Sequence, residues 1–137
     1  MEYLALPSAA PPPVLQRDAP FKAILIADIP CDLDRQYQLS DWLLAAGCRY
    51  VMVTGRYSEG WTQMLDATNL ARFNFETMPD AEVVIATDHP GDMLTDIFWF
   101  SRYSAMHPLT ELKELVCVHL TDQPDQTAIE AAFAEVG

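Results

Sequence analysis

Four short runs of apolar residues recur along the chain, and each is bounded by polar residues, glycine or proline. They cover residues 21–29, 50–54, 82–87 and 115–120. Continuous apolar runs of this length are typical of strands that are covered on both faces of a sheet. The pattern therefore predicts four short buried strands.

The segments that follow these runs carry apolar side chains at helical spacing. Residues 34–46 repeat them at intervals of three and four, and Gly47 follows where a helix commonly ends. The same spacing predicts further helices that begin near Ser58, Asp92 and Pro124. Strands and helices thus alternate along the chain.

This alternation predicts one α/β domain over residues 21–137. Strands that alternate with helices favour right-handed crossovers, and hence a mostly parallel, four-stranded sheet with helices on both faces. We expect a three-layer, flavodoxin-like (broadly Rossmann-like) arrangement. In the expected strand order, 50–54 lies at one edge, followed by 21–29, 82–87 and 115–120.

Residues 1–20 differ in composition from the rest of the chain. They hold five of the ten prolines and show neither strand nor helix periodicity. We therefore predict a proline-rich, extended arm outside the core fold. Tyr3, Leu4 and Leu6 are among the side chains expected to anchor it on its own domain or on a neighbouring molecule.

The chain is strongly acidic, and its charge limits the partners it can bind. Twenty Asp and Glu residues face eight Lys and Arg residues, which gives a net charge of -12. Such a surface repels phosphate backbones and anionic lipids, so we expect neither direct nucleic-acid binding nor membrane binding. If there is a macromolecular partner, we expect a protein, of basic character.

The cysteines and the N-terminal residues indicate the cellular compartment of the protein. The three cysteines are widely spaced and odd in number, which fits reduced thiols better than disulfides or a zinc site. The first residues lack the basic and long apolar stretches of a secretory signal. We therefore expect a cytoplasmic protein.

Polar residues follow the predicted strands at the edge where open parallel sheets bind ligands. The candidates for catalysis at this edge are Asp28, Cys31, Asp32, Arg56, Asp88 and His89. The acids suggest a cation such as Mg²⁺, but no lysine follows the last strand to support phosphoryl chemistry. Loop residues and helix caps are the alternative interpretation of these acids, so we assign no metal site.

The residues at this edge bear on two other kinds of chemistry, nucleophilic catalysis and nucleotide binding. Cys31 could act as a nucleophile with His89 as its base, although nothing in the spacing indicates contact. Gly55 is not followed by the further glycines of a nucleotide-binding loop, so no cofactor is expected. His119 lies inside a predicted strand and is expected to be packed, which leaves His89 as the histidine placed for chemistry.

The predicted helix from Asp92 to about His107 is unusually apolar around its circumference. Trp99, Tyr103 and Met106 add a second stripe to the one that would face the sheet, and Phe100 is a further large apolar side chain of this helix. Aromatic side chains of this kind often anchor interfaces, so we name these four, together with the arm, as candidate interface residues. Coverage by the arm or by residues 71–81 is the alternative, and a homodimer through this helix is a further one.

Four stretches together resemble an uncharacterised family of short bacterial α/β domains of unknown function. They are GWTQMLDATNL, the MPD turn, TDHPGDMLTDIFWF and the HP pair that follows the aromatic helix. The likeness covers residues 21 to about 122. It implies the α/β fold and a bacterial origin, and it transfers no catalytic residue.

These observations support two functional hypotheses. The first is a protein-interaction module, such as an immunity protein, an antitoxin or an accessory factor of a defence operon, and under it the chain is not an enzyme. It follows from the charge, the aromatic helix and the lack of a catalytic motif. The alternative is a small enzyme or ligand sensor that works at the carboxyl ends of the strands.

Overall fold

A five-stranded parallel sheet forms the centre of the molecule. The computed structural model describes residues 1–137. The strands are β1 (Glu2–Leu6), β2 (Phe21–Ala27), β3 (Cys48–Thr54), β4 (Ile85–Asp88) and β5 (Leu115–Leu120). The helices are α1 (Leu33–Ala45), α2 (Trp61–Arg72), α3 (Leu94–Tyr103) and α4 (Gln126–Val136), with a short 3-10 turn at Asp80–Glu82.

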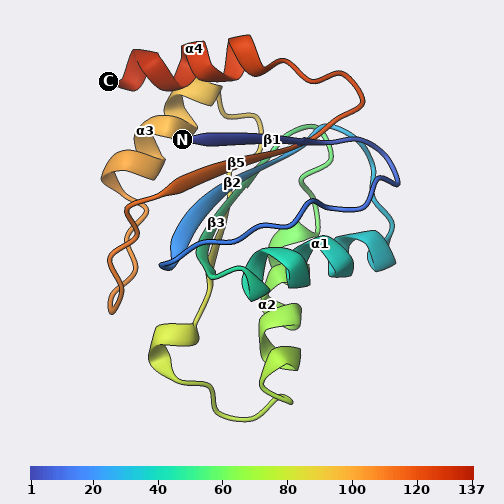
Figure 1. The fold of residues 1–137 in the computed structure, drawn as a ribbon, viewed down its shortest axis with the longest axis vertical. Coiled ribbons are helices and arrows are strands. Elements are labelled where there is room, and N and C mark those ends of the chain that lie inside the picture. Colours follow the sequence, from blue (N-terminus) through green and yellow to red (C-terminus); the bar gives the residue numbers. More distant parts are fainter.

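The helices cover both faces of the sheet, which gives three layers (Figure 1). Side chains alternate along each strand between the two faces. In β2, Ala23 and Leu25 join the core cluster under α1 and α2, whereas Ile24 and Ile26 join the cluster under α3 and α4. The predicted three-layer α/β class is confirmed.

The strand order is β1-β5-β2-β3-β4, which differs from the expected one. The strand 115–120 was expected at the far edge beyond 82–87, but it lies directly beside β2. Across the sheet, the chain runs from β2 to β3 to β4 in one direction. It then returns past β3 and β2 to form β5 on the other side of β2. A right-handed crossover in the reverse direction must use the other face, so α3 lies opposite α1 and α2.

The N-terminal segment contributes a fifth strand that the sequence pattern did not reveal. β1 pairs in parallel with β5, with Tyr3 opposite Cys117 and Leu6 opposite Leu120. The expected count of four strands was therefore one too low. Because β1 is a short edge strand with one fully buried side chain, its apolar run is too weak to stand out.

The proline-rich connection from β1 to β2 runs back along α1. The Trp42 side-chain Nε1–H donates to the Pro13 carbonyl oxygen at 2.7 Å, and the Arg35 guanidinium donates to the Ala10 carbonyl oxygen at 2.6 Å. The segment 7–20 is thus tied to its own domain, and β1 is built into the sheet.

Strands β2 and β5 are neighbours whose connections leave the sheet on opposite faces. After β2 the chain enters α1 on one face, and after β5 it enters α4 on the other. A crevice opens at such a point outside the carboxyl ends of the strands, and ligands bind there in open α/β sheets. The fold therefore marks one place along this edge before any side chain is considered.

The helix predicted from Asp92 to about His107 is shorter in the structure. α3 spans Leu94–Tyr103, and its N-cap residue Met93 makes no side-chain capping bond. His107 lies beyond the helix, where its Nε2 lies 2.8 Å from the Val83 carbonyl oxygen. No helix in the structure combines the length and apolar character needed to cross a bilayer.

Candidate functional site

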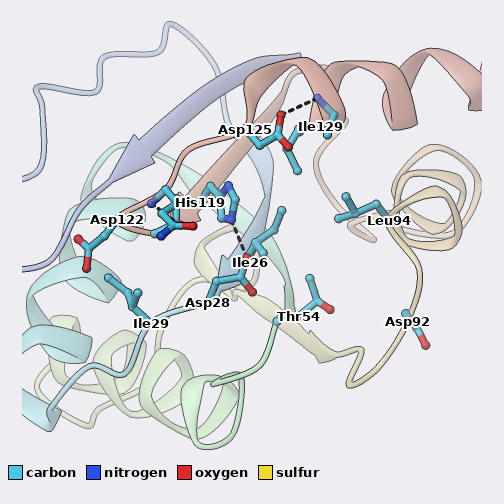
Figure 2. Close-up of a pocket in the computed structure, with 14 residues that line it drawn as sticks. Ile26, Asp28, Ile29, Thr54, Asp92, Leu94, His119, Asp122, Asp125 and Ile129 are labelled. Atoms are coloured by element: carbon cyan, nitrogen blue, oxygen red, sulfur yellow. Dashed lines mark hydrogen bonds and ion pairs between the residues drawn. The ribbon is translucent and has the colours of Figure 1, made fainter.

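A cavity of about 720 Å³ opens at the point where β2 and β5 diverge. Its wall consists of the carboxyl ends of β2, β3 and β5 together with the beginnings of α3 and α4 (Figure 2). The volume falls within the roughly 300–1,000 Å³ that is typical of small-molecule sites. Fold topology and cavity therefore indicate the same location.

A hydrogen-bonded network joins three strands at this cavity. His119 Nε2 lies 2.7 Å from Asp28 Oδ2, and His119 Nδ1 lies 2.7 Å from the Tyr3 hydroxyl (Figure 2 shows the first pair). The Asp125 backbone N–H donates to the same hydroxyl at 3.3 Å. With the neutral ring protonated on Nε2, each group has a partner: Tyr3 donates to Nδ1, and Nε2–H donates to Asp28.

Burial makes this network rigid at one end and open at the other. The His119 side chain is only 7 % exposed, whereas that of Asp28 is 42 % exposed at the cavity. Burial is the main cause that raises the pKa of Tyr3, so its phenol stays neutral and acts as a hydrogen-bonding strut. The network fixes the direction of the Asp28 carboxylate.

Three other aspartates line the cavity, and each already has a structural partner. Asp122 accepts hydrogen bonds from the Ser8 backbone and hydroxyl at 2.8 and 3.0 Å. Asp125 caps α4, and Asp92 lies 3.3 Å from His89 Nδ1. Asp28, Asp92 and Asp125 each keep one carboxylate oxygen without a partner, and Asp28 is the one of the three whose other oxygen is held by the buried His119.

The lining carries a marked excess of negative charge. It includes four aspartates and no lysine or arginine. No three His, Cys, Asp or Glu side chains of the chain come close enough together to hold a metal ion. The chemistry of the cavity therefore suits an organic cation that donates hydrogen bonds to carboxylates.

Of the six candidate catalytic residues, the structure places only Asp28 in this cavity. Cys31 and Asp32 line a separate pocket of about 250 Å³, next to Arg35. Asp32 is the N-cap of α1 and accepts from the Arg35 backbone N–H at 2.8 Å. Burial is the main cause that raises the pKa of Cys31, which disfavours the thiolate that a nucleophile needs.

The other three candidates lie outside the lining of the large cavity. The Arg56 guanidinium lies over the Tyr57 ring, 5.6 Å from its centre, and Asp88 is exposed at the end of β4. His89 Nε2 lies 2.7 Å from the Thr87 hydroxyl, and its ring meets Phe100 edge to face. The structure therefore does not bring the six together.

His119 is the residue that the sequence interpretation missed. It was expected to be packed inside a strand, and it is buried, but its ring also holds Asp28. Its partners lie 91 and 116 residues away in the sequence, so no local spacing could reveal them. The available signal was its position next to the end of a strand, where a polar side chain reaches the ligand-binding edge.

The candidate interface residues fall into two groups. Trp99, Tyr103 and Met106 are 55 %, 50 % and 68 % exposed, and the rings of Trp99 and Tyr103 lie 5.1 Å apart. Phe100 is instead partly buried, with its ring 4.6 Å from that of His89.

The residues of the proposed arm, Tyr3, Leu4 and Leu6, belong to β1 and are used within the domain. Leu4 and Leu6 pack with the core cluster under α1 and α2.

A comparison with known protein families decides which family the chain represents. The family model described as "Domain of unknown function (DUF7684)" matches residues 1–136. The chain belongs to the DUF7684 family. The match to this family includes β1 and the proline-rich segment, which the resemblance noted from the sequence did not cover. No curated protein and no solved structure matches this DUF7684 chain.

Proposed function

We propose that this DUF7684 domain binds a small organic cation, such as a primary amine, in the cavity between the ends of β2 and β5. The observation that carries the proposal is the Asp28 carboxylate, which His119 holds at 2.7 Å with one oxygen still free. A prepositioned carboxylate recognises an ammonium group with little ordering cost.

The electrostatics of the cavity support a cation over an anion. Four aspartates line it without a compensating lysine or arginine. An anion placed there would meet like charges in a partly desolvated cavity, which is costly. Ammonium hydrogens, by contrast, would replace the water molecules that solvate Asp28.

Apolar side chains give the site a second recognition element. Ile26, Leu94 and Ile129 contribute to the wall of the cavity (Figure 2). A ligand with an amine at one end and an apolar or aromatic body would therefore use both parts of the lining. Binding and sensing are the function proposed, because Tyr3 stays neutral and no activated nucleophile lines the cavity.

The proposal is tested by NMR titration of the full chain with matched probes. Tyramine is the cationic probe, and tyrosol, which carries a hydroxyl in place of the amine, is the neutral match. We expect tyramine to shift backbone amide signals around Asp28, Thr54 and Ala128, and tyrosol to bind at least about tenfold more weakly. Equal binding of the two probes would refute a charge-selective site.

Asp28→Asn removes the charge and keeps the shape of the side chain. We expect this variant to weaken tyramine binding by about 10- to 100-fold, the range for a hydrogen bond to a charged group. Asp88→Asn is the matched control, since Asp88 is exposed at the end of β4 and outside the cavity. Wild-type affinity of Asp28→Asn would contradict the role given to Asp28.

We propose a second function, a protein-interaction module, on the exposed face of α3. The specific observation is that Trp99 and Tyr103 of α3 are at least half exposed with their rings 5.1 Å apart, and that Met106, just beyond the end of α3, is also exposed. Large aromatic side chains commonly anchor interfaces, and the net charge of -12 favours a basic partner. An immunity-like, antitoxin-like or defence-accessory role in a bacterium would fit such a surface.

The interaction proposal is tested on this face directly. Trp99→Ala should abolish binding of a partner that co-purifies with the wild-type chain, whereas Leu70→Ala, on the opposite face, should retain it. Unchanged binding by Trp99→Ala would contradict the proposal. A dimer in light scattering that Trp99→Ala converts to a monomer would assign the face to self-association instead.

The proposed setting is a reducing compartment such as the bacterial cytoplasm. All three cysteines are free thiols, and Cys48 and Cys117 are buried. Free buried thiols persist where reductants keep them reduced, which supports this setting.

A further inference from the structure

Another cavity, of about 210 Å³, lies at the amino ends of β2 and β5, between α3 and α4. Lys22 and Leu115, which contribute to its lining, are at the beginnings of these strands. Figure 1 shows this as the end of the molecule where both chain termini lie. The cavity is therefore separate from the one at Asp28, which opens at the carboxyl ends.

The charge of this cavity is opposite to that of the whole chain. Its lining includes Lys22, Arg102 and Lys113, three of only eight basic residues, and none of the twenty acidic ones. Lys22 and Arg102 form no ion pair with a carboxylate, and Lys113 reaches only Glu111, at 3.8 Å between two exposed side chains. In a chain of net charge -12, such a local excess of cations attracts anions.

Lys22 is the deepest of the three cations. Its Nζ donates to the Ser101 carbonyl oxygen at the end of α3, which uses one of the three hydrogens of the ammonium group. Burial lowers the pKa of Lys22, as expected for an ammonium group that is partly removed from water without a counter-ion. An anion in the cavity would supply the missing counter-charge.

Apart from Ser101, the rest of the lining is hydrophobic. Phe98 from α3 and Phe133 from α4 meet edge to face, with their ring centres 5.4 Å apart. Met1, Leu115 and Val136 complete this part of the wall. A ligand therefore meets cations on one side and aromatic and aliphatic carbon on the other.

We propose that this cavity binds a small monocarboxylate with a short aliphatic or aromatic tail. The carboxylate lies between Lys22 and Arg102, and the tail packs against Phe98 and Phe133. The volume of about 210 Å³ is below the range typical of drug-sized ligands, so the tail is short, comparable to benzoate or hexanoate. Inorganic phosphate lacks the apolar body that the two phenylalanines would contact.

The experiment is an NMR titration of the full chain with benzoate and hexanoate, up to about 10 mM, where a site of millimolar affinity is mostly filled. Benzyl alcohol and hexanol are the neutral matches, and inorganic phosphate tests whether charge alone suffices. We expect both carboxylates to shift signals of Ser101, Leu115 and Val136, with the alcohols and phosphate at least about fivefold weaker. No shift at these residues, or equal shifts with the alcohols, overturns the proposal.

Variants at the cavity separate binding from folding. Lys22→Met keeps the length of the side chain and should weaken benzoate binding at least about tenfold. Arg102 lies on the surface, so Arg102→Gln should leave the fold intact and weaken benzoate binding about fivefold. Arg56→Gln is the control, because Arg56 also forms no ion pair with a carboxylate and lies outside this cavity. This variant should bind benzoate with wild-type affinity. Unchanged affinity in Arg102→Gln overturns the proposal even if Lys22→Met fails to fold.

Discussion

The hydroxyl group of Tyr3 offers a sharp test of the network that holds Asp28. Tyr3→Phe removes one oxygen and retains the ring, which meets the His119 ring edge to face at 5.8 Å. The substitution therefore leaves apolar packing in place and deletes two hydrogen bonds: the one to His119 Nδ1 at 2.7 Å and the one from the Asp125 N–H at 3.3 Å.

The expected cost follows from the burial of the two partners. His119 is 6 % exposed, so its Nδ1 would lose its donor without gaining water, at about 1–3 kcal/mol. Asp125 is exposed, so its N–H can bond to solvent at little cost. Tyr3→Phe should therefore lower the free energy of unfolding by about 1–3 kcal/mol.

Chemical denaturation with urea measures this change, and thermal melting checks it. For a domain of this size each kcal/mol lowers Tm by about 3–5 °C. Tyr37→Phe is the matched control, because Tyr37 is 50 % exposed on α1 and its hydroxyl makes no hydrogen bond. That variant should stay within about 0.5 kcal/mol of the wild type.

The result that would refute this reasoning is equally specific. If Tyr3→Phe is as stable as Tyr37→Phe, then the Tyr3 hydroxyl does not support His119, and β1 is not coupled to the site through it. The direction of Asp28 would then need another explanation.

Two further predictions concern the edge of the sheet and the thiols. Gly55→Ala should lower the free energy of unfolding by at least about 2 kcal/mol. Gly55 has a positive φ of 103°, and a Cβ on it would lie 2.6 Å from the backbone of Ala27, the last residue of β2. Gly60→Ala, with φ 85° and open space around it, should cost only about 1 kcal/mol, and equal costs in urea denaturation would contradict this contrast. Burial raises the pKa of Cys48 and Cys117 to about 12, so a thiol reagent at pH 8 should label only Cys31 in the folded chain, and more slowly than free cysteine. Labelling of all three without denaturant would contradict their burial.

The sequence was sufficient for most of the fold because burial on both faces leaves long apolar runs. The apolar runs at 21–29 and 115–120 predict strands on that basis, and the structure has β2 at Phe21–Ala27 and β5 at Leu115–Leu120. β1 was not predicted, because an edge strand buries fewer apolar side chains and so leaves a weaker sequence pattern. The strand order was wrong because no local signal shows that the chain returns past β3 and β2 before it forms β5.

The candidate site was harder to predict than the fold. Asp28 was named because a residue after a buried strand lies at the ligand-binding edge. His119 was set aside as a packed residue, although a buried histidine can also position a carboxylate. The sequence could not place Tyr3 at this site, because its contact with His119 depends on the pairing of β1 with β5.

The central claim is that the cavity at Asp28 binds an amine through a carboxylate held by His119. The most direct measurement follows the ring nitrogens of His119 by ¹⁵N NMR while tyramine is added to the full chain. Because Asp28 is shared between His119 Nε2 and the bound amine, we expect the Nε2 signal to move along with the binding curve and Asp28→Asn to abolish this response. A tyramine complex that leaves the Nε2 signal unchanged would contradict the account.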